Sequence, residues 1–214
     1  MIPTITPDTL TLSPGSEVIL RYQTWEDYEQ LLQVRQNRAA LKITFDAVTR
    51  EIRIMAPLPG HGKRSAALTA LIQALLRHTG QDWDSYDPIT LKQLQQKGVE
   101  PDHCFYVQNR EALLGQEQID LAIDPPPDLA VEMDLTSLTQ ASDYNEIGVP
   151  ELWIYRQARL LIYCFDGQRY RESTVSPLFP DIAVRDLIPV YVEQAWTEGS
   201  SIALRAFERY LASL

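Results

Sequence analysis

Hydrophobic and polar positions alternate over two short segments in the N-terminal half of the chain. The segments Leu41–Asp46 (LKITFD) and Arg50–Met55 (REIRIM) place apolar side chains at every second position and are separated by a short turn. Alternation with a period of two is typical of a half-buried strand, and two such runs joined by a turn predict a β-hairpin. Pro57 and Pro59 end the second strand, because proline cannot donate a ladder hydrogen bond.

Helical patterns lie on both sides of this hairpin. Thr24 is followed three residues later by an acidic residue and then by a leucine pair, which indicates a capped helix start. From His61 to His78, apolar residues recur at intervals of three and four, so an amphipathic helix is expected there. The same spacing predicts two more helices near the C-terminus, over Val184–Ala195 and Ile202–Leu211.

Short apolar runs in the second half of the chain predict strands. His103–Val107 (HCFYV) and Leu129–Met133 (LAVEM) are apolar and bounded by proline, which favours buried strands. A short helix is expected over Thr139–Glu146, and three further strands at Leu152–Tyr155, Leu160–Phe165 and Arg169–Ser173. With no repeat and no break in composition, the sequence predicts one α/β (α+β) domain spanning residues 1–214.

The charge of the chain restricts how it could bind DNA. The net charge is −10; residues 1–100 hold 11 Lys+Arg and 11 Asp+Glu, whereas residues 101–214 hold 8 and 18. Tight binding of duplex DNA usually requires a basic surface, because phosphate neutralisation supplies most of the non-specific affinity. DNA would therefore be bound through a local basic patch. The best candidate is Lys63, Arg64 and Arg77 on the polar side of one helix, a group that is more often a solvated face.

The sequence offers little evidence for a membrane or secretory protein. No segment approaches 18 consecutive apolar residues, so no membrane partner is expected. The first residues lack the basic and apolar regions of a signal peptide. Cys104 and Cys164 are too few for a disulfide framework, which favours a reducing cytoplasm. A homo-oligomer is left open.

Two acidic residues stand out because of their neighbours. Asp102 lies at the start of a predicted strand, directly after a proline, and Glu132 lies inside an apolar strand. A carboxylate buried in a strand is unfavourable unless it is paired, hydrogen-bonded or bound to a cation. If the two strands are neighbours, Asp102 and Glu132 offer the oxygen ligands that Mg²⁺ prefers. The alternative is structural: Glu132 pairs with an arginine and Asp102 caps a turn.

Three motifs in this region resemble a known bacterial family. They are Glu100-Pro101-Asp102, the segment from Pro126 to Asp134, and the segment from Gly148 to Trp153. With them the chain resembles, from about residue 24 to about residue 190, the Uma-type restriction-endonuclease-like family, a domain of unknown function in the PD-(D/E)XK nuclease superfamily. The resemblance implies a mixed central sheet flanked by helices. It also implies that Asp102 and Glu132 hold Mg²⁺ or Mn²⁺ for hydrolysis of phosphodiester bonds in DNA.

The chain departs from the family pattern at two positions. Gln140 stands where most relatives have a catalytic lysine, and Gly62 follows His61 where many relatives have glutamate. Glutamine carries no charge, so stabilisation of the transition state would weaken. Lys63 or Lys92 are candidates to replace the lysine. Two hypotheses therefore stand: a metal-dependent DNA endonuclease using Asp102, Glu132 and Gln140, and a catalytically inactive binding or regulatory module.

Other reactive side chains do not form a recognisable site in the sequence. The three histidines, His61, His78 and His103, lack the spacing of zinc ligands. Ser137 and Cys104 lack a plausible pairing with a histidine and an acid, so nucleophilic catalysis is not expected.

Overall fold

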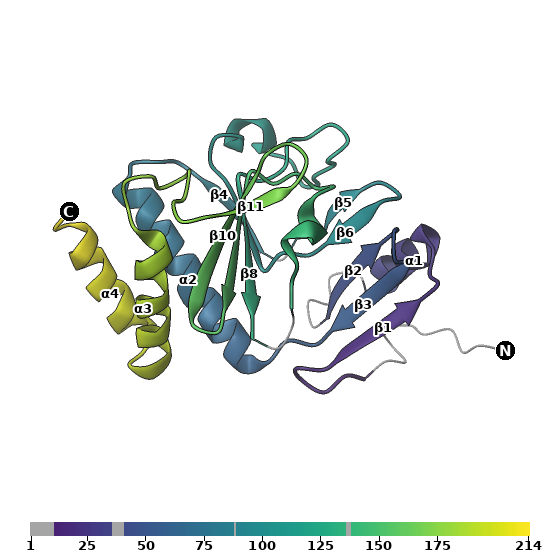
Figure 1. Cartoon of the computed structure of the whole chain (residues 1–214), viewed down its shortest axis with the longest axis horizontal. Helices are drawn as coiled ribbons and strands as arrows, with labels where there is room; N and C mark the ends of the chain where they lie inside the picture. The colour runs from purple at the N-terminus through teal and green to yellow at the C-terminus, as the bar shows by residue number, and fades with distance from the viewer. Residues whose placement is uncertain (1–10, 36–40, 88, 136–137) are drawn as a thin grey trace.

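The computed structural model describes residues 11–35, 41–87, 89–135 and 138–214 (Figure 1). Within these residues the chain forms two β-sheets, four α-helices and two short 3₁₀ helices. The predicted mixed α/β class is therefore confirmed. The expectation of one central sheet is incomplete, because the N-terminal hairpin belongs to a second sheet.

The first sheet, called here the N-terminal sheet, is antiparallel throughout and lies at the right of Figure 1. Its strand order is β1-β3-β2-β6-β5. The strands are β1 (Glu17–Arg21), β2 (Lys42–Asp46), β3 (Glu51–Met55), β5 (Leu91–Gln93) and β6 (Lys97–Val99). The predicted hairpin is β2–β3, whereas β1, β5 and β6 are too short or too weakly patterned for the sequence to indicate.

The second sheet, called here the central sheet, is mixed. Its strand order is β11-β10-β9-β8-β7-β4, with β8 and β9 parallel and every other pair antiparallel. The strands are β4 (Asp84–Tyr86), β7 (His103–Tyr106), β8 (Leu129–Asp134), β9 (Glu151–Arg156), β10 (Arg159–Phe165) and β11 (Tyr170–Ser173). All five strands predicted in this half of the chain are present, and β4 is additional.

The helices divide between the two sheets. Helix α1 (Trp25–Arg35) packs on the N-terminal sheet, where Tyr28 and Leu31 join Ile43 and Ile52 in one core cluster. Helices α2 (Pro59–His78), α3 (Val184–Thr197) and α4 (Ser200–Leu211) cover one face of the central sheet (Figure 1). The 3₁₀ helices are η1 (Arg110–Leu113) and η2 (Ala141–Tyr144); η2 replaces the longer α-helix expected over Thr139–Glu146.

Strand β8 has the alternation that the sequence predicts. Leu129, Val131 and Met133 face the core under the helices, while Ala130 belongs to the cluster on the opposite face. That opposite face is covered by the η2 segment and by the ends of β5 and β6. Glu132 therefore points out of the helical core and toward the junction of the two sheets. None of the described helices is long and apolar enough to cross a membrane.

Candidate functional site

The two acidic residues singled out by the sequence lie on neighbouring strands. Strands β7 and β8 pair antiparallel, with His103 opposite Val131. The backbone N–H of Asp102 extends the ladder by donating to the carbonyl of Val131 at 3.0 Å. Asp102 therefore lies beside Glu132 at the same end of the two strands, as expected.

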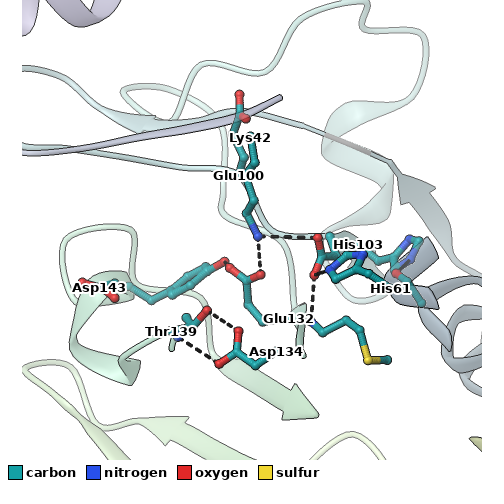
Figure 2. Close-up of polar contacts among 12 residues, drawn as sticks. Lys42, His61, Glu100, His103, Glu132, Asp134, Thr139 and Asp143 are labelled. Atoms are coloured by element: carbon teal, nitrogen blue, oxygen red, sulfur yellow. Dashed lines mark hydrogen bonds and ion pairs between the residues drawn. The ribbon is translucent and has the colours of Figure 1, made fainter. Parts of the chain in front are cut away.

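A lysine from the other sheet joins the two carboxylates. Lys42 Nζ donates to Glu132 Oε2 at 2.5 Å (Figure 2). The same nitrogen lies 3.5 Å from Asp102 Oδ1. Because both oxygens lie within 3.5 Å of one nitrogen atom, the carboxylates converge on one point. The side chains of Glu132, Asp102 and Lys42 are only 4%, 11% and 17% exposed, so this charged group is largely removed from water.

The position of Lys42 follows from the alternation of β2. Ile43 and Phe45 point into the core with α1, so Lys42 must project from the opposite face of the strand, toward the central sheet. Glu100 fixes this part of β2 by accepting the Ile43 N–H at 2.8 Å. Glu100 is itself held by both terminal nitrogens of Arg35. The Glu-Pro-Asp motif thus has two roles. Its glutamate anchors the strand that carries Lys42, and its aspartate is Asp102 of the site.

Three further contacts orient the carboxylates. Asp102 Oδ2 accepts the backbone N–H of Met133 at 2.7 Å and lies 3.2 Å from His61 Nε2, at the start of α2. On the other side, the Tyr144 hydroxyl donates to Glu132 Oε1 at 2.5 Å. Each carboxylate therefore has one oxygen near Lys42 and the other on a different hydrogen-bonding partner. Such restraint is what a metal or substrate site requires of its ligands.

The segment that carries Tyr144 is held by two ion pairs. The nearly buried Lys97 of β6 donates to Asp46 at 2.6 Å and to Asp143 of η2 at 3.1 Å. Asp134, at the end of β8, accepts hydrogen bonds from Thr139 and Arg156. These contacts tie η2 to both sheets and place the Tyr144 hydroxyl over Glu132.

The environment shifts the pKa values of the three charged groups in different directions. Burial alone would raise the pKa of Asp102, but Lys42, His61 and the Met133 N–H together hold it below its ordinary value. Burial would lower the pKa of Lys42, but the two carboxylates raise it above its ordinary value. Burial, with the charge of Asp102, raises the pKa of Glu132 despite Lys42 and Tyr144. Asp102 and Lys42 therefore stay charged at neutral pH.

The carboxylate pair meets the requirements of one kind of metal site. Within the described part of the chain, no group of three or more His, Cys, Asp or Glu side chains is arranged to hold a metal ion. Mg²⁺, however, takes one or two carboxylates and completes its octahedral shell with water and phosphate oxygens. The oxygens of Asp102 and Glu132 fit that chemistry. The Lys42 ammonium now lies against these oxygens and would have to move aside for a cation.

Two cavities meet at Lys42. One, of about 190 Å³, is lined by Glu132, Tyr144 and Lys97. The other, of about 940 Å³, is lined by Asp102, His61 and many residues of the Glu-Pro-Asp region. Lys42 borders both, so the carboxylates are reached from either side through the junction of the two sheets.

Gln140 does not join this group in the described residues. Its side chain is exposed, and its backbone N–H donates to Asp143 at the start of η2. Gly62 lies in open space, where an added Cβ would meet no atom within 4 Å. Of the proposed substitutes for the lysine, Lys92 pairs with Glu29 and Lys63 donates to the Trp196 carbonyl, so neither reaches the carboxylates.

The candidate basic patch is engaged by the C-terminal helices. Lys63 and Arg64 both lie over the ring of Trp196, and Arg64 also pairs with Glu193. Arg77 pairs with Glu208. These contacts reduce the positive charge available to phosphates. The patch is therefore mainly a packing surface between α2, α3 and α4.

Sequence reasoning missed Lys42 and the role of Tyr144. The alternation of β2 indicates that Lys42 faces away from Ile43 and Phe45. Its partner Glu132, however, lies 90 positions further along the chain. The arginine partner considered for Glu132 is wrong: the partner is a lysine. Only the packing of the two sheets brings this lysine to the carboxylates.

Comparisons with known proteins place these features in context. Residues 25–196 match the model of the Uma2 family, whose description is “Putative restriction endonuclease”. One matching solved structure is described as that of “a putative nuclease belonging to DUF820 from Anabaena variabilis”. It shares 13% sequence identity, with a TM-score of 0.52 over 77% of this chain and 98% of that chain, and so supports the fold alone. No curated protein matches the chain.

Proposed function

This chain belongs to the Uma2 family, and from this membership we propose that it is a metal-dependent endonuclease that hydrolyses phosphodiester bonds in DNA. The observation that carries the proposal is the convergence of Asp102, Glu132 and Lys42 on one point. Buried carboxylates that converge in a cavity are typical of a functional site, because burial of charge is unfavourable without a compensating role.

Asp102 and Glu132 would hold Mg²⁺ or Mn²⁺ in this site. The bound ion would supply Lewis acidity toward a phosphate oxygen and lower the pKa of a bound water. The chain itself orients the ligands. His61 and the Met133 N–H fix Asp102, and the Tyr144 hydroxyl fixes Glu132.

Lys42 would take the part of the lysine that is missing at position 140. It is the cation in contact with both carboxylates, whereas Gln140 is exposed at the start of η2. An ammonium group beside the scissile phosphate would stabilise the charge that develops as the phosphodiester is attacked. In this proposal the positive charge comes from β2 of the N-terminal sheet.

The second candidate function is a non-catalytic binding or regulatory module. One observation favours it: the Lys42 ammonium already compensates both carboxylates, so the folded site is stable without a metal ion. The net charge of −10 also disfavours strong DNA binding.

Plasmid nicking over several hours, in Mn²⁺ and in EDTA, tests the proposal. The wild type should nick supercoiled DNA in Mn²⁺, and Asp102→Asn should abolish the activity. Lys42→Met should lower the rate by about 10²–10³, the usual effect of removing one charge-stabilising donor. Lys92→Met is the matched control, since Lys92 borders the larger cavity but pairs with Glu29, and it should leave the rate unchanged.

Each variant also excludes an alternative. Nicking that survives Asp102→Asn would come from a contaminant, and the nuclease proposal would fall. Gln140→Lys should have little effect; a large gain would assign the lysine role to position 140 and not to Lys42. A wild type that neither nicks DNA nor melts at a higher temperature with Mn²⁺ would support the non-catalytic module.

A further inference from the structure

The smaller of the two cavities, of about 190 Å³, extends away from the carboxylate site between the N-terminal sheet and the η2 segment. Lys42 and Glu132 line it where it meets that site. Other lining residues come from β2 and β3, and from Thr139 and Tyr144, before and within η2. A nucleic-acid strand whose phosphate lies at the carboxylates therefore has this cavity beside the adjoining nucleotide.

Two polar side chains of the N-terminal sheet face this cavity from neighbouring strands. Thr44 projects from the same face of β2 as Lys42, and it lies directly opposite Arg53 of β3. Arg53 is half-exposed and only loosely paired, at 3.4 Å from Glu51 and 3.9 Å from Glu17. Exposed pairs of this kind contribute little to stability, so the guanidinium can turn to a ligand.

The size and charge of the cavity favour one uncharged ring. A cavity of about 150 Å³ holds benzene, so 190 Å³ takes a single ring and not the two fused rings of a purine. Among the described residues that line it, five are acidic and three are basic, which disfavours a phosphate group there. Leu138, which is 67% exposed, adds an apolar surface on which a ring can pack. Ser137, which the sequence raised as a nucleophile, lies outside the described residues.

We propose that this cavity binds one pyrimidine base of an unpaired DNA strand, beside the phosphodiester bond that is cleaved; this inference rests on the nuclease function proposed above. Arg53 donates to O2, the ring oxygen that cytosine and thymine share, and the Thr44 hydroxyl bonds to a neighbouring polar atom of the ring. Leu138 packs against the face of the ring.

The preferred substrate follows from the position of this base. A base that enters the cavity has left the stack of the double helix, which costs free energy for a paired base and least for one that is already unpaired. The substrate is therefore single-stranded DNA or an unpaired region of a duplex. Negative supercoiling favours local opening of DNA, so a supercoiled plasmid remains a substrate.

Fluorescence anisotropy with labelled oligonucleotides in Ca²⁺ tests the base site without cleavage. The wild type should bind oligo-dT about tenfold more tightly than oligo-dA or a duplex of equal length. Because adenines also stack on one another in oligo-dA, the variants are needed to assign this preference to the cavity. Arg53→Met should weaken binding of oligo-dT by about tenfold, through loss of the charged donor, and leave oligo-dA binding unchanged.

Arg21→Met is the matched control, because Arg21 also pairs with Glu51 but is not among the residues that line the cavity. It should retain the preference for oligo-dT. Thr44→Phe fills the cavity and should remove the preference, while Mn²⁺ still raises the melting temperature because the carboxylates are unchanged. Circular dichroism establishes that each variant is folded, and the half-exposed Arg53 provides the test if Thr44→Phe is unstable.

Three results would overturn the inference. They are equal affinity of the wild type for oligo-dT and oligo-dA, an equal loss of both in Arg53→Met, and no binding of either oligonucleotide. A protein that prefers oligo-dT through Arg53 but never nicks plasmid keeps the base site and loses the nuclease proposal. A protein that nicks plasmid without this preference keeps the nuclease proposal and loses the base site.

Discussion

Lys42 is the residue on which the candidate site depends, because it is the cation in contact with two buried carboxylates. A buried charge left without its partner is strongly destabilising, whereas a complete group of compensated charges is tolerated.

Replacing Lys42 should make stability depend on a metal ion. Lys42→Met leaves Asp102 and Glu132 facing each other, which should lower the free energy of unfolding by about 3–5 kcal/mol in EDTA. Millimolar Mn²⁺ should then raise the melting temperature of the variant more than that of the wild type, because the ion replaces the lost charge. Lys92→Met should behave like the wild type. A variant that is as stable as the wild type and insensitive to Mn²⁺ would contradict this role.

The hydrogen bond from Tyr144 to Glu132 can be tested by removing a single hydroxyl group. Tyr144→Phe removes the hydroxyl that donates to the buried Glu132 and leaves this acceptor without that partner. Urea unfolding should show a loss of about 2 kcal/mol. Tyr170→Phe removes a hydroxyl that donates to the Val149 carbonyl, just before β9, and should lower the free energy of unfolding by about 1 kcal/mol. Equal losses would mean that Glu132 does not depend on Tyr144.

At the scale of elements, the turn after β2 is connected to η2 through β6. Lys97 lies between Asp46 at the end of β2 and Asp143 in η2, and its side chain is only 7% exposed. Since η2 carries Tyr144, this bridge links the geometry of the N-terminal sheet to the orientation of Glu132. Gly98, next in β6, allows the close approach of Tyr28, whose hydroxyl would lie 2.2 Å from an added Cβ.

The bridge should give the protein a defined response to acid. Burial would raise the pKa of Asp46, but Lys97 and the N–H groups of Thr49 and Val48 hold it below its ordinary value of 3.8. The ionised carboxylate therefore contributes stability above about pH 4, and this contribution is lost as pH falls through the lower folded-state pKa. Asp46→Asn keeps the turn but removes the charge.

Melting temperatures of the wild type and Asp46→Asn should consequently differ most at pH 5–7. The expected difference there corresponds to about 1 kcal/mol, because the pair is partly exposed. It should narrow as the pH falls from 3.8 through the lower folded-state pKa, below which Asp46 is protonated in both folded and unfolded chains. Asp143 also faces Lys97, so the melting temperature of Asp143→Asn, measured over the same pH range, is compared with that of Asp46→Asn. A difference that grows on acidification would contradict the assignment.

At the scale of the whole molecule, the site lies where two separate sheets adjoin, in a protein of net charge −10. Among the residues that the structure describes, three cations near the site are engaged: Arg35 with Glu100, Lys92 with Glu29 and Lys97 with Asp46. A bound divalent ion would add positive charge where the chain supplies little. Association with DNA should therefore depend on that ion more than on a basic surface.

Gel-shift titration with duplex DNA, in EDTA and in Ca²⁺, tests this dependence. Binding should be undetectable at micromolar protein in EDTA and should appear with Ca²⁺ in the wild type but not in Asp102→Asn. The slope of log affinity against log salt should be about −1 to −2, which corresponds to one or two neutralised phosphates. Ion-independent binding with a slope of about −5 or steeper would reveal an extended basic surface.

The sequence by itself determined most of the longer elements and half of the candidate site. Period-two alternation located β2, β3 and β8, and the same alternation placed Glu132 on the face opposite the helical core. The proline before Asp102 placed this residue at a strand end. The match to the Uma2 family confirms the resemblance that the sequence motifs indicate. These features are local, because strand periodicity and turn chemistry depend on residues within one element.

Only the tertiary structure decided what faces these residues. The partner of Glu132 comes from a strand 90 residues earlier. Periodicity fixes the face from which Lys42 projects, but not which element packs against that face. The packing depends on the division into two sheets. Strands β5 and β6, which complete the N-terminal sheet, have three-residue patterns that are too brief to signal this division. A local pattern determines the direction of a side chain, whereas the long-range packing of the sheets determines its partner.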